Sequence, residues 1–295
     1  MSDLYPFKPH YLNINGNRCH YVDEGQGEAI LMIHGNPTWS FYYRELIKAF
    51  SDRYRVIAPD HIGCGLSDKP GDDQYDYTLA TRLSDLDHFI SHNSLERITL
   101  VVHDWGGMIG MAWATQNPDR ISRIVLLNTA AFPKPNGKDF HTTLRLARSR
   151  WFGALLVRGL NAFVRGAIRF SVTRKPMPPE IAACYLEPYS SWADRIAIHR
   201  FVQDIPLRSG DQAFEILTNT AASLKCLSDK PMLICWGMRD FIFDHHFLDE
   251  WTTRFPNVDV HRFEDCGHYI LEDAGGEVIS LIERFLQSYP LEVCQ

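Results

Sequence analysis

The sequence lacks the features of membrane-spanning, disulfide-rich and metal-cluster proteins. No apolar run in its 295 residues approaches the roughly 20 residues of a membrane-spanning helix. The first ten residues are polar and contain proline, unlike a secretory signal peptide. The seven cysteines are scattered and never spaced as CxxC, which is typical of reduced thiols. We therefore expect a cytoplasmic protein without a disulfide framework.

Basic charge is also scarce, with 30 Lys and Arg against 36 Asp and Glu and a net charge of -6. This balance argues against nucleic acid as a partner. The exception is residues 141–175, a segment without any acid whose eight basic side chains are Arg145, Arg148, Arg150, Arg158, Arg165, Arg169, Arg174 and Lys175. The rest of the chain carries a net charge of -14, so this segment is built differently.

Short apolar runs alternate with segments of helical spacing, which predicts a mostly parallel sheet with helices on both faces. Asn15-Gly16 separates the first two runs and indicates a hairpin, so the sheet should begin antiparallel. The predicted helices cover Tyr77–His92, Gly106–Asn117, Asp244–Phe255 and Ala274–Gln287. The eight predicted strands are Tyr11–Ile14, Cys19–Asp23, Ala29–Ile33, Tyr54–Ala58, Ile98–Val102, Ile121–Leu127, Met232–Trp236 and Val258–Phe263.

The alternation stops near Pro133 and resumes near Pro231, leaving a helical stretch with no convincing strand. A helical insertion between two strands of an α/β sheet is typical of a lid. We therefore predict a core over residues 1–132 and 228–295, with a helical cap over residues 133–227 that contains the basic segment.

Three predicted strands are followed by a titratable residue, at the edge where open α/β sheets place their sites. Asp104 ends the strand in ITLVVHDWGG and precedes two glycines, as in a nucleophile elbow, although Val102 stands where that motif commonly has glycine. Asp240 follows the strand in CWGMRD, and His268 follows the last strand in DCGHYI. The order Asp104, Asp240, His268 is that of the nucleophile, acid and base of an α/β-hydrolase triad.

An aspartate nucleophile favours attack on a saturated carbon that bears a leaving group. The product is an alkyl ester of Asp104 whose carbonyl stays open to water, and His268, oriented by Asp240, could activate that water. The departing anion needs hydrogen-bond donors, which the Trp105 indole and the Asn36 amide could supply. An ordinary esterase is disfavoured because the serine is missing.

Other polar residues have simpler explanations. Asp244, His245, His246 and His261 could hold a metal, but Asp244 resembles a helix N-cap and the adjacent histidines should face different directions. We therefore expect no metal and no cofactor. His103 and His34 are expected to be structural.

The motifs HGNPTWS, HDWGG, WGMRD and the final GH resemble those of the haloalkane dehalogenases of the α/β-hydrolase superfamily. The resemblance implies that Asp104 is the nucleophile, His268 the base and Asp240 the acid. It also implies that Asn36 and Trp105 bind the leaving anion. One dehalogenase subfamily carries its acid after the sixth strand, where this chain has Thr129 or a neighbour.

Longer segments, HGNPTWSFYYREL, HDWGGMIGMAWA, RFVQDIPL and WGMRDFIFDHHFLDEW, are similar to the β-lactone decarboxylases of bacterial long-chain olefin biosynthesis. This resemblance implies that Asp104 opens a cis-β-lactone with long alkyl chains at its sp3 β-carbon. Loss of carbon dioxide then gives a cis-alkene. It also implies assembly with other enzymes of that pathway.

The triad alone does not choose between a β-lactone and a haloalkane. An epoxide hydrolase would need lid tyrosines such as Tyr185 and Tyr189 to protonate the epoxide oxygen, and a receptor or scaffold would not need an intact triad. Apolar cap residues could line a tunnel for alkyl chains or simply pack the cap; they are Leu144, Leu146, Leu155, Leu156, Leu160, Phe163 and Ile168. The cap arginines could be a solvated face, or could dock an acidic partner or a membrane surface.

Overall fold

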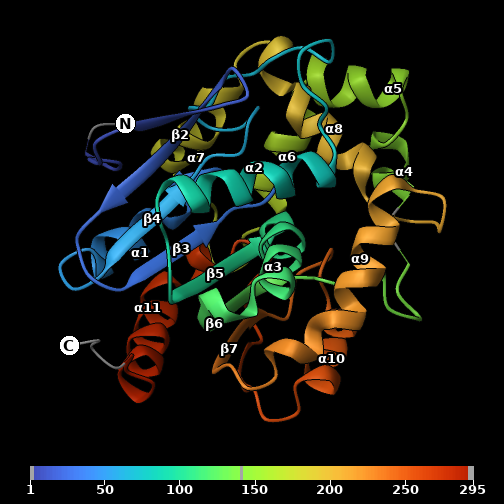
Figure 1. Ribbon diagram of the computed structural model, residues 1–295. Coiled ribbons are helices and arrows are strands. Elements are labelled where there is room, and N and C mark those ends of the chain that lie inside the picture. Colours follow the sequence, from blue (N-terminus) through green and yellow to red (C-terminus); the bar gives the residue numbers. More distant parts are fainter. Residues whose placement is uncertain (1–2, 140–141, 292–295) are drawn as a thin grey trace.

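A computed structural model describes residues 3–139 and 142–291. Its centre is an eight-stranded sheet in the order β1-β2-β4-β3-β5-β6-β7-β8 (Figure 1). Strand β2 pairs antiparallel with both β1 and β4. The other five pairs of neighbouring strands, from β4-β3 to β7-β8, are parallel. The strands are β1 (His10–Ile14), β2 (Asn17–Glu24), β3 (Ala29–Ile33), β4 (Arg55–Pro59), β5 (Ile98–Asp104), β6 (Ile121–Thr129), β7 (Met232–Gly237) and β8 (Asp259–Phe263). The predicted α/β-hydrolase sheet is confirmed, strand for strand.

Alternate residues of the buried strands pack on opposite faces of the sheet. Leu31 and Ile33 of β3 join the apolar cluster under α2, α3 and α10, whereas Ile30 and Met32 join the cluster under α1 and α11. The helices of this core are α1 (Arg44–Phe50), α2 (Leu79–His92), α3 (Trp105–Gln116), α10 (His245–Arg254) and α11 (Ile270–Ser288). The sheet is therefore covered by helices on both faces, and the loops after the strands form the edge at their carboxyl ends.

Between β6 and β7 the described residues form helical segments and no strand. They are α4 (Thr142–Ala147), α5 (Trp151–Ala154), a π-helical turn η3 (Leu155–Gly159), α6 (Ala162–Phe170), α7 (Pro179–Leu186), α8 (Ile196–Asp204) and α9 (Gln212–Ser223). Figure 1 shows that α4, α5, α6 and α8 lie above the carboxyl ends of β3, β5 and β6. The boundaries of a separate cap domain, 133–227, stay a prediction.

Most cysteines behave as small core residues: Cys19, Cys64, Cys184, Cys235 and Cys266 are buried, and Cys226 is exposed. Cys294 lies outside the described residues. No helix in the described part of the chain is long and apolar enough to cross a bilayer.

Candidate active site

Asp104 occupies the tight turn between β5 and α3. Its backbone has φ 53° and ψ -127°, a conformation that non-glycine residues rarely adopt and that costs about 1–3 kcal/mol. Gly106 allows this turn to approach β3, because a Cβ there would lie 1.9 Å from the main-chain oxygen of Ile33. The strand-to-helix elbow predicted from HDWGG is therefore present, with Asp104 at its apex.

The departure of the elbow from its usual pattern at Val102 has a local explanation. A Cβ on Gly110 of α3 would lie 2.8 Å from Cγ1 of Val102. The glycine that the motif commonly has in the strand is thus replaced by one in the helix, and the two elements can still approach closely.

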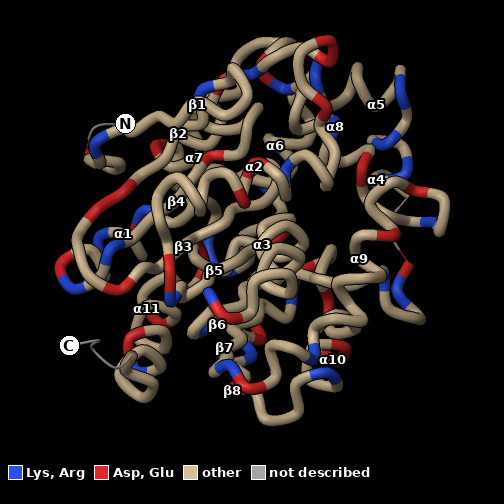
Figure 2. The backbone as a smooth tube through the Cα atoms, in the orientation of Figure 1, with Lys and Arg blue, Asp and Glu red and all other residues tan. Residues whose placement is uncertain are grey.

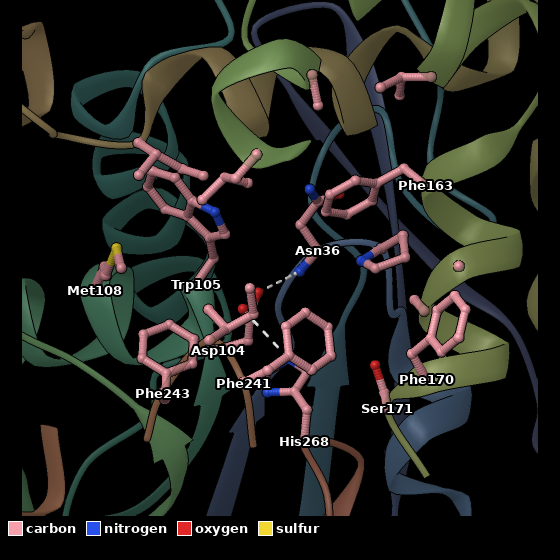
Figure 3. Close-up of a pocket in the computed structure, with 18 of the residues that line it drawn as sticks. Asn36, Asp104, Trp105, Met108, Phe163, Phe170, Ser171, Phe241, Phe243 and His268 are labelled. Carbon is pink, nitrogen blue, oxygen red and sulfur yellow. Dashed lines mark hydrogen bonds and ion pairs between the residues drawn. The ribbon is translucent and has the colours of Figure 1, made fainter. Parts of the chain in front are cut away.

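The three residues of the predicted triad lie together. His268 Nδ1 is 2.7 Å from Asp240 Oδ2, and His268 Nε2 is 3.5 Å from Asp104 Oδ2 (Figure 3). The second oxygen of Asp104 accepts a hydrogen bond of 2.6 Å from the main-chain N–H of Asn36. All three triad side chains are buried. They come from the carboxyl ends of three parallel strands, as the order in the sequence predicts.

Electrostatics favours an ion pair across the triad. Burial alone would lower the pKa of His268, but the charges of Asp240 and Asp104 and their hydrogen bonds raise it to about 10. Burial would raise the pKa of Asp104, but the hydrogen bond and charge of His268 outweigh it, and the pKa is lowered. At neutral pH Asp104 is therefore a carboxylate facing an imidazolium.

Two hydrogen-bond donors flank Asp104, as expected. Trp105 lines the cavity beside Asp104 (Figure 3), and its Nε1 is a hydrogen-bond donor. Asn36 Nδ2 donates to the main-chain oxygen of Ile198 at 3.3 Å, and its amide carries a second hydrogen. An anion released beside Asp104 would meet one donor from the loop after β3 and one from the first turn of α3, and neither donor is an acid.

Sequence reasoning missed Asn128, which holds the acid of the triad, and did not foresee how His103 supports His268. Asn128, at the end of β6, donates from Nδ2 to Asp240 Oδ2 at 3.1 Å and to the main-chain oxygen of Gly237 at 3.0 Å. His103 donates from Nε2 to the main-chain oxygen of His268 at 2.9 Å, and the two rings are 4.5 Å apart. Burial lowers the pKa of His103 to about 3, so it is neutral. His103 is structural, as expected, but it supports His268 directly.

A cavity of about 770 Å³ opens above Asp104. Apart from Asn36, Asp104, Trp105, Lys134, Ser171 and His268, its lining is apolar. In Figure 3, Met108 and Phe243 lie on one side of Asp104, and Phe163 and Phe170 lie on the other. The site therefore offers an apolar surface on each side of the nucleophile.

The apolar cap residues serve different purposes. Leu144, Leu156 and Phe163 line the cavity, and Ile168 packs against the core. Leu146, Leu155 and Leu160 are exposed, so of the two alternatives the tunnel lining does not apply to these three.

Neither tyrosine that an epoxide hydrolase would require is in the cavity. Tyr185 donates its hydroxyl proton to Glu272, and Tyr189 Oη accepts a hydrogen bond of 3.2 Å from the main-chain N–H of Gly65. Both are buried, and no tyrosine is found among the described residues that line the cavity. The geometry therefore provides no phenol to protonate an epoxide oxygen.

The possible metal cluster differs in detail from the sequence expectation. Asp244 does cap α10, accepting from His246 N at 3.1 Å. The expectation that His245 and His246 diverge is wrong, because ligand atoms of Asp244, His245 and His246 lie within 4.8 Å of one another. The other carboxylate oxygen of Asp244 binds Lys138 Nζ at 2.9 Å. The negative charge of Asp244 is thus balanced by the ammonium group of Lys138 and by the positive N-terminal end of α10.

Comparison with known proteins places this geometry in a family. The family model of the alpha/beta hydrolase fold matches residues 28–275. The cis-3-alkyl-4-alkyloxetan-2-one decarboxylase of Shewanella oneidensis is 53% identical over 97% of this chain and 90% of its own length. The protein of the same name from Xanthomonas campestris pv. campestris is 43% identical over 97% of this chain and 98% of its own length.

The fold also matches a crystal structure of the haloalkane dehalogenase DatA from Agrobacterium tumefaciens C58. The TM-score is 0.88 over 98% of this chain and 99% of that one, at 24% sequence identity. At that identity the match concerns the fold alone. The chain belongs to the α/β-hydrolase fold family, in which it groups with the two oxetanone decarboxylases.

Proposed function

We propose that this enzyme is a β-lactone decarboxylase that converts cis-3-alkyl-4-alkyloxetan-2-ones to cis-alkenes and carbon dioxide. The observation that carries the proposal is the 53% identity, over 97% of the chain, to a relative with that name. The apolar surfaces on both sides of Asp104 support it, because this class of substrate carries an alkyl group on each of two adjacent ring carbons.

The reaction balances without water or an external base. A carboxylate oxygen of Asp104 attacks C4 of the oxetanone, and the C4–O bond breaks to give an Asp104 ester and a free carboxylate. The electrons of the C3–carboxylate bond then form the C3=C4 double bond. The ester C4–O bond breaks in the same step, so carbon dioxide leaves and the Asp104 carboxylate returns. Inversion at C4 followed by anti elimination converts a cis-lactone to a cis-alkene.

The polar residues next to Asp104 each have a role in this proposal. Trp105 Nε1 and the free amide hydrogen of Asn36 stabilise the carboxylate released from the ring. The imidazolium of His268, held by Asp240, keeps Asp104 ionised before the attack. His268 moves no proton in the decarboxylation, since none is gained or lost.

Haloalkane dehalogenation is the second candidate, because the same nucleophile and anion donors suit a halide. There the Asp104 ester must be hydrolysed, and His268 must act as a base. The test offers the purified enzyme a long-chain cis-β-lactone and, separately, 1-bromobutane. We expect alkene from the lactone; bromide release without any alkene would overturn the leading proposal.

For the cap we propose contact with an anionic lipid surface, which would give the enzyme access to an oily substrate. Trp151 is 80% exposed, and it shares one helical face with Leu155, which is 53% exposed. Leu155 and Trp192 both border Gly159, and the Arg158 guanidinium lies 4.7 Å from the Trp192 ring centroid. Figure 2 shows Lys and Arg along α4 and α5. Exposed tryptophan beside arginine is typical of interfacial binding.

Sedimentation with vesicles of phosphatidylglycerol and phosphatidylcholine tests this contact. Trp151→Ser and the double variant Arg158→Glu with Arg165→Glu should lose vesicle binding. Tyr11→Ser, which changes an exposed aromatic residue of β1 outside the cap, should retain it. Capture of an acidic pathway enzyme by the cap, with no binding to vesicles, would overturn the lipid assignment in favour of a protein partner.

A further inference from the structure

Helix α6 presents one face to the cavity, and Gly166 lies in the middle of that face. Ala162, Phe163, Gly166, Ala167 and Phe170 all line the cavity, with the spacing of a single stripe on an α-helix. Glycine inside a helix weakens it relative to alanine, so its presence there calls for a local reason.

The fold does not require glycine at position 166. A Cβ there would meet no heavy atom within 4 Å, and the backbone is helical. At Gly106, by contrast, the added atom would collide with β3. The missing side chain at position 166 therefore adds open space to the cavity wall and relieves no contact.

This space lies on a defined side of the nucleophile. Gly166 is three residues after Phe163 and four before Phe170, so it shares their face of α6. Phe163 and Phe170 lie on the opposite side of Asp104 from Met108 and Phe243 (Figure 3). If a ligand has one alkyl arm on each side of Asp104, only one of the two arms would lie next to Gly166.

We propose that the space beside Gly166 holds part of one alkyl arm of the substrate and sets the longest arm accepted on that side. The inference rests on the proposed function, because it takes a two-armed lactone as the substrate. It predicts that the enzyme distinguishes the two arms of the substrate. A side chain at position 166 should reduce the longest arm accepted on the α6 side and leave the other side unchanged.

The variant Gly166→Leu tests this, with Gly276→Leu as the matched control. Gly276 is also within a helix, α11, and its added Cβ would also meet no atom within 4 Å, but it is exposed and outside the cavity. For a lactone with two decyl arms, kcat/KM of Gly166→Leu should fall about tenfold or more. Each methylene excluded from burial is worth roughly a factor of four. With two butyl arms it should stay within about twofold of the wild type.

Unsymmetrical lactones make the test sharper. Of the two isomers with one butyl and one decyl arm, only the one that directs decyl toward α6 should lose activity in Gly166→Leu. Equal losses for both isomers, or no loss for the didecyl substrate, would overturn the inference.

A binding measurement separates this inference from the proposed function. If the wild type yields no alkene from any of these lactones, the proposed function fails. Equilibrium binding of fluorescent probes with a decyl or a butyl chain then decides the role of Gly166. Weaker binding of only the decyl probe to Gly166→Leu supports the arm site, and unchanged binding of that probe overturns it.

Discussion

His268 is held by Asp240 through a 2.7 Å contact from Nδ1 to Oδ2, and it meets Asp104 with its other nitrogen. In a hydrolytic enzyme this histidine activates water, whereas in the proposed decarboxylation it only keeps Asp104 ionised. The two reactions should therefore respond differently to its removal.

The variant His268→Asn should separate the two reactions. Without the imidazolium, Asp104 and Asp240 are two buried carboxylates, so the pKa of Asp104 rises. Lactone decarboxylation should fall about tenfold or more at neutral pH and recover as the pH is raised. Any bromide released from 1-bromobutane should stop at one equivalent, measured as a burst. Hydrolysis of 1-bromobutane by His268→Asn at the wild-type rate would contradict the assignment. The surface variant His92→Asn serves as control.

Stability should depend on pH through the same ion pair. The pKa of His268 is about 10 in the folded protein, against roughly 6.5 in an unfolded chain. Its contribution to the free energy of unfolding is therefore full below about pH 6.5 and lost as the pH rises through about 10. Urea unfolding should show a larger stability difference between wild type and His268→Asn near pH 6 than near pH 10. An equal difference at both would contradict the shifted pKa.

Trp105→Phe removes the indole donor and keeps an aromatic ring against Phe201, whose centroid is 5.2 Å away. Because one donor to the released carboxylate is lost, kcat for the lactone should fall about a hundredfold. Steady-state alkene formation measures it, with the exposed Trp151→Phe as control. A kcat within about twofold of the wild type would show that Trp105 does not serve the leaving group.

The elbow itself can be tested through Val102 and Gly110. Gly110→Ala places a methyl 2.8 Å from Cγ1 of Val102, so the free energy of unfolding should fall by about 1–3 kcal/mol. Adding Val102→Ala to Gly110→Ala should recover part of this loss, since it removes the clashing methyl. The two changes would be additive in a denaturation double-mutant cycle if the side chains did not meet.

The sequence predicts the core well because its strands are continuous apolar runs and its titratable residues follow them directly. Asp104, Asp240 and His268 could be found from that pattern alone. Asn128 could not, because it is the amide partner of an acid more than a hundred residues away and has no motif of its own. An amide at the end of a buried strand next to the predicted acid is the one available signal.

The cap is less predictable, because its helices are short and their outward residues are also apolar. Leu155 and Leu156 are neighbours in the sequence, yet one is exposed and the other lines the cavity. The two residues are chemically identical, so only the orientation of the helix about its axis decides which of them faces the cavity. Likewise, the distance between His245 and His246 depends on side-chain rotamers, which the sequence does not reveal.

The central claim is that Asp104 opens the lactone and is restored without water. Turnover of a long-chain cis-β-lactone in oxygen-18-labelled water, followed by mass spectrometry of the Asp104 peptide, tests it directly. The account predicts cis-alkene and carbon dioxide from the wild type, none from Asp104→Ala, and no heavy oxygen in Asp104. A β-hydroxy acid as the product, or heavy oxygen in Asp104, would contradict it.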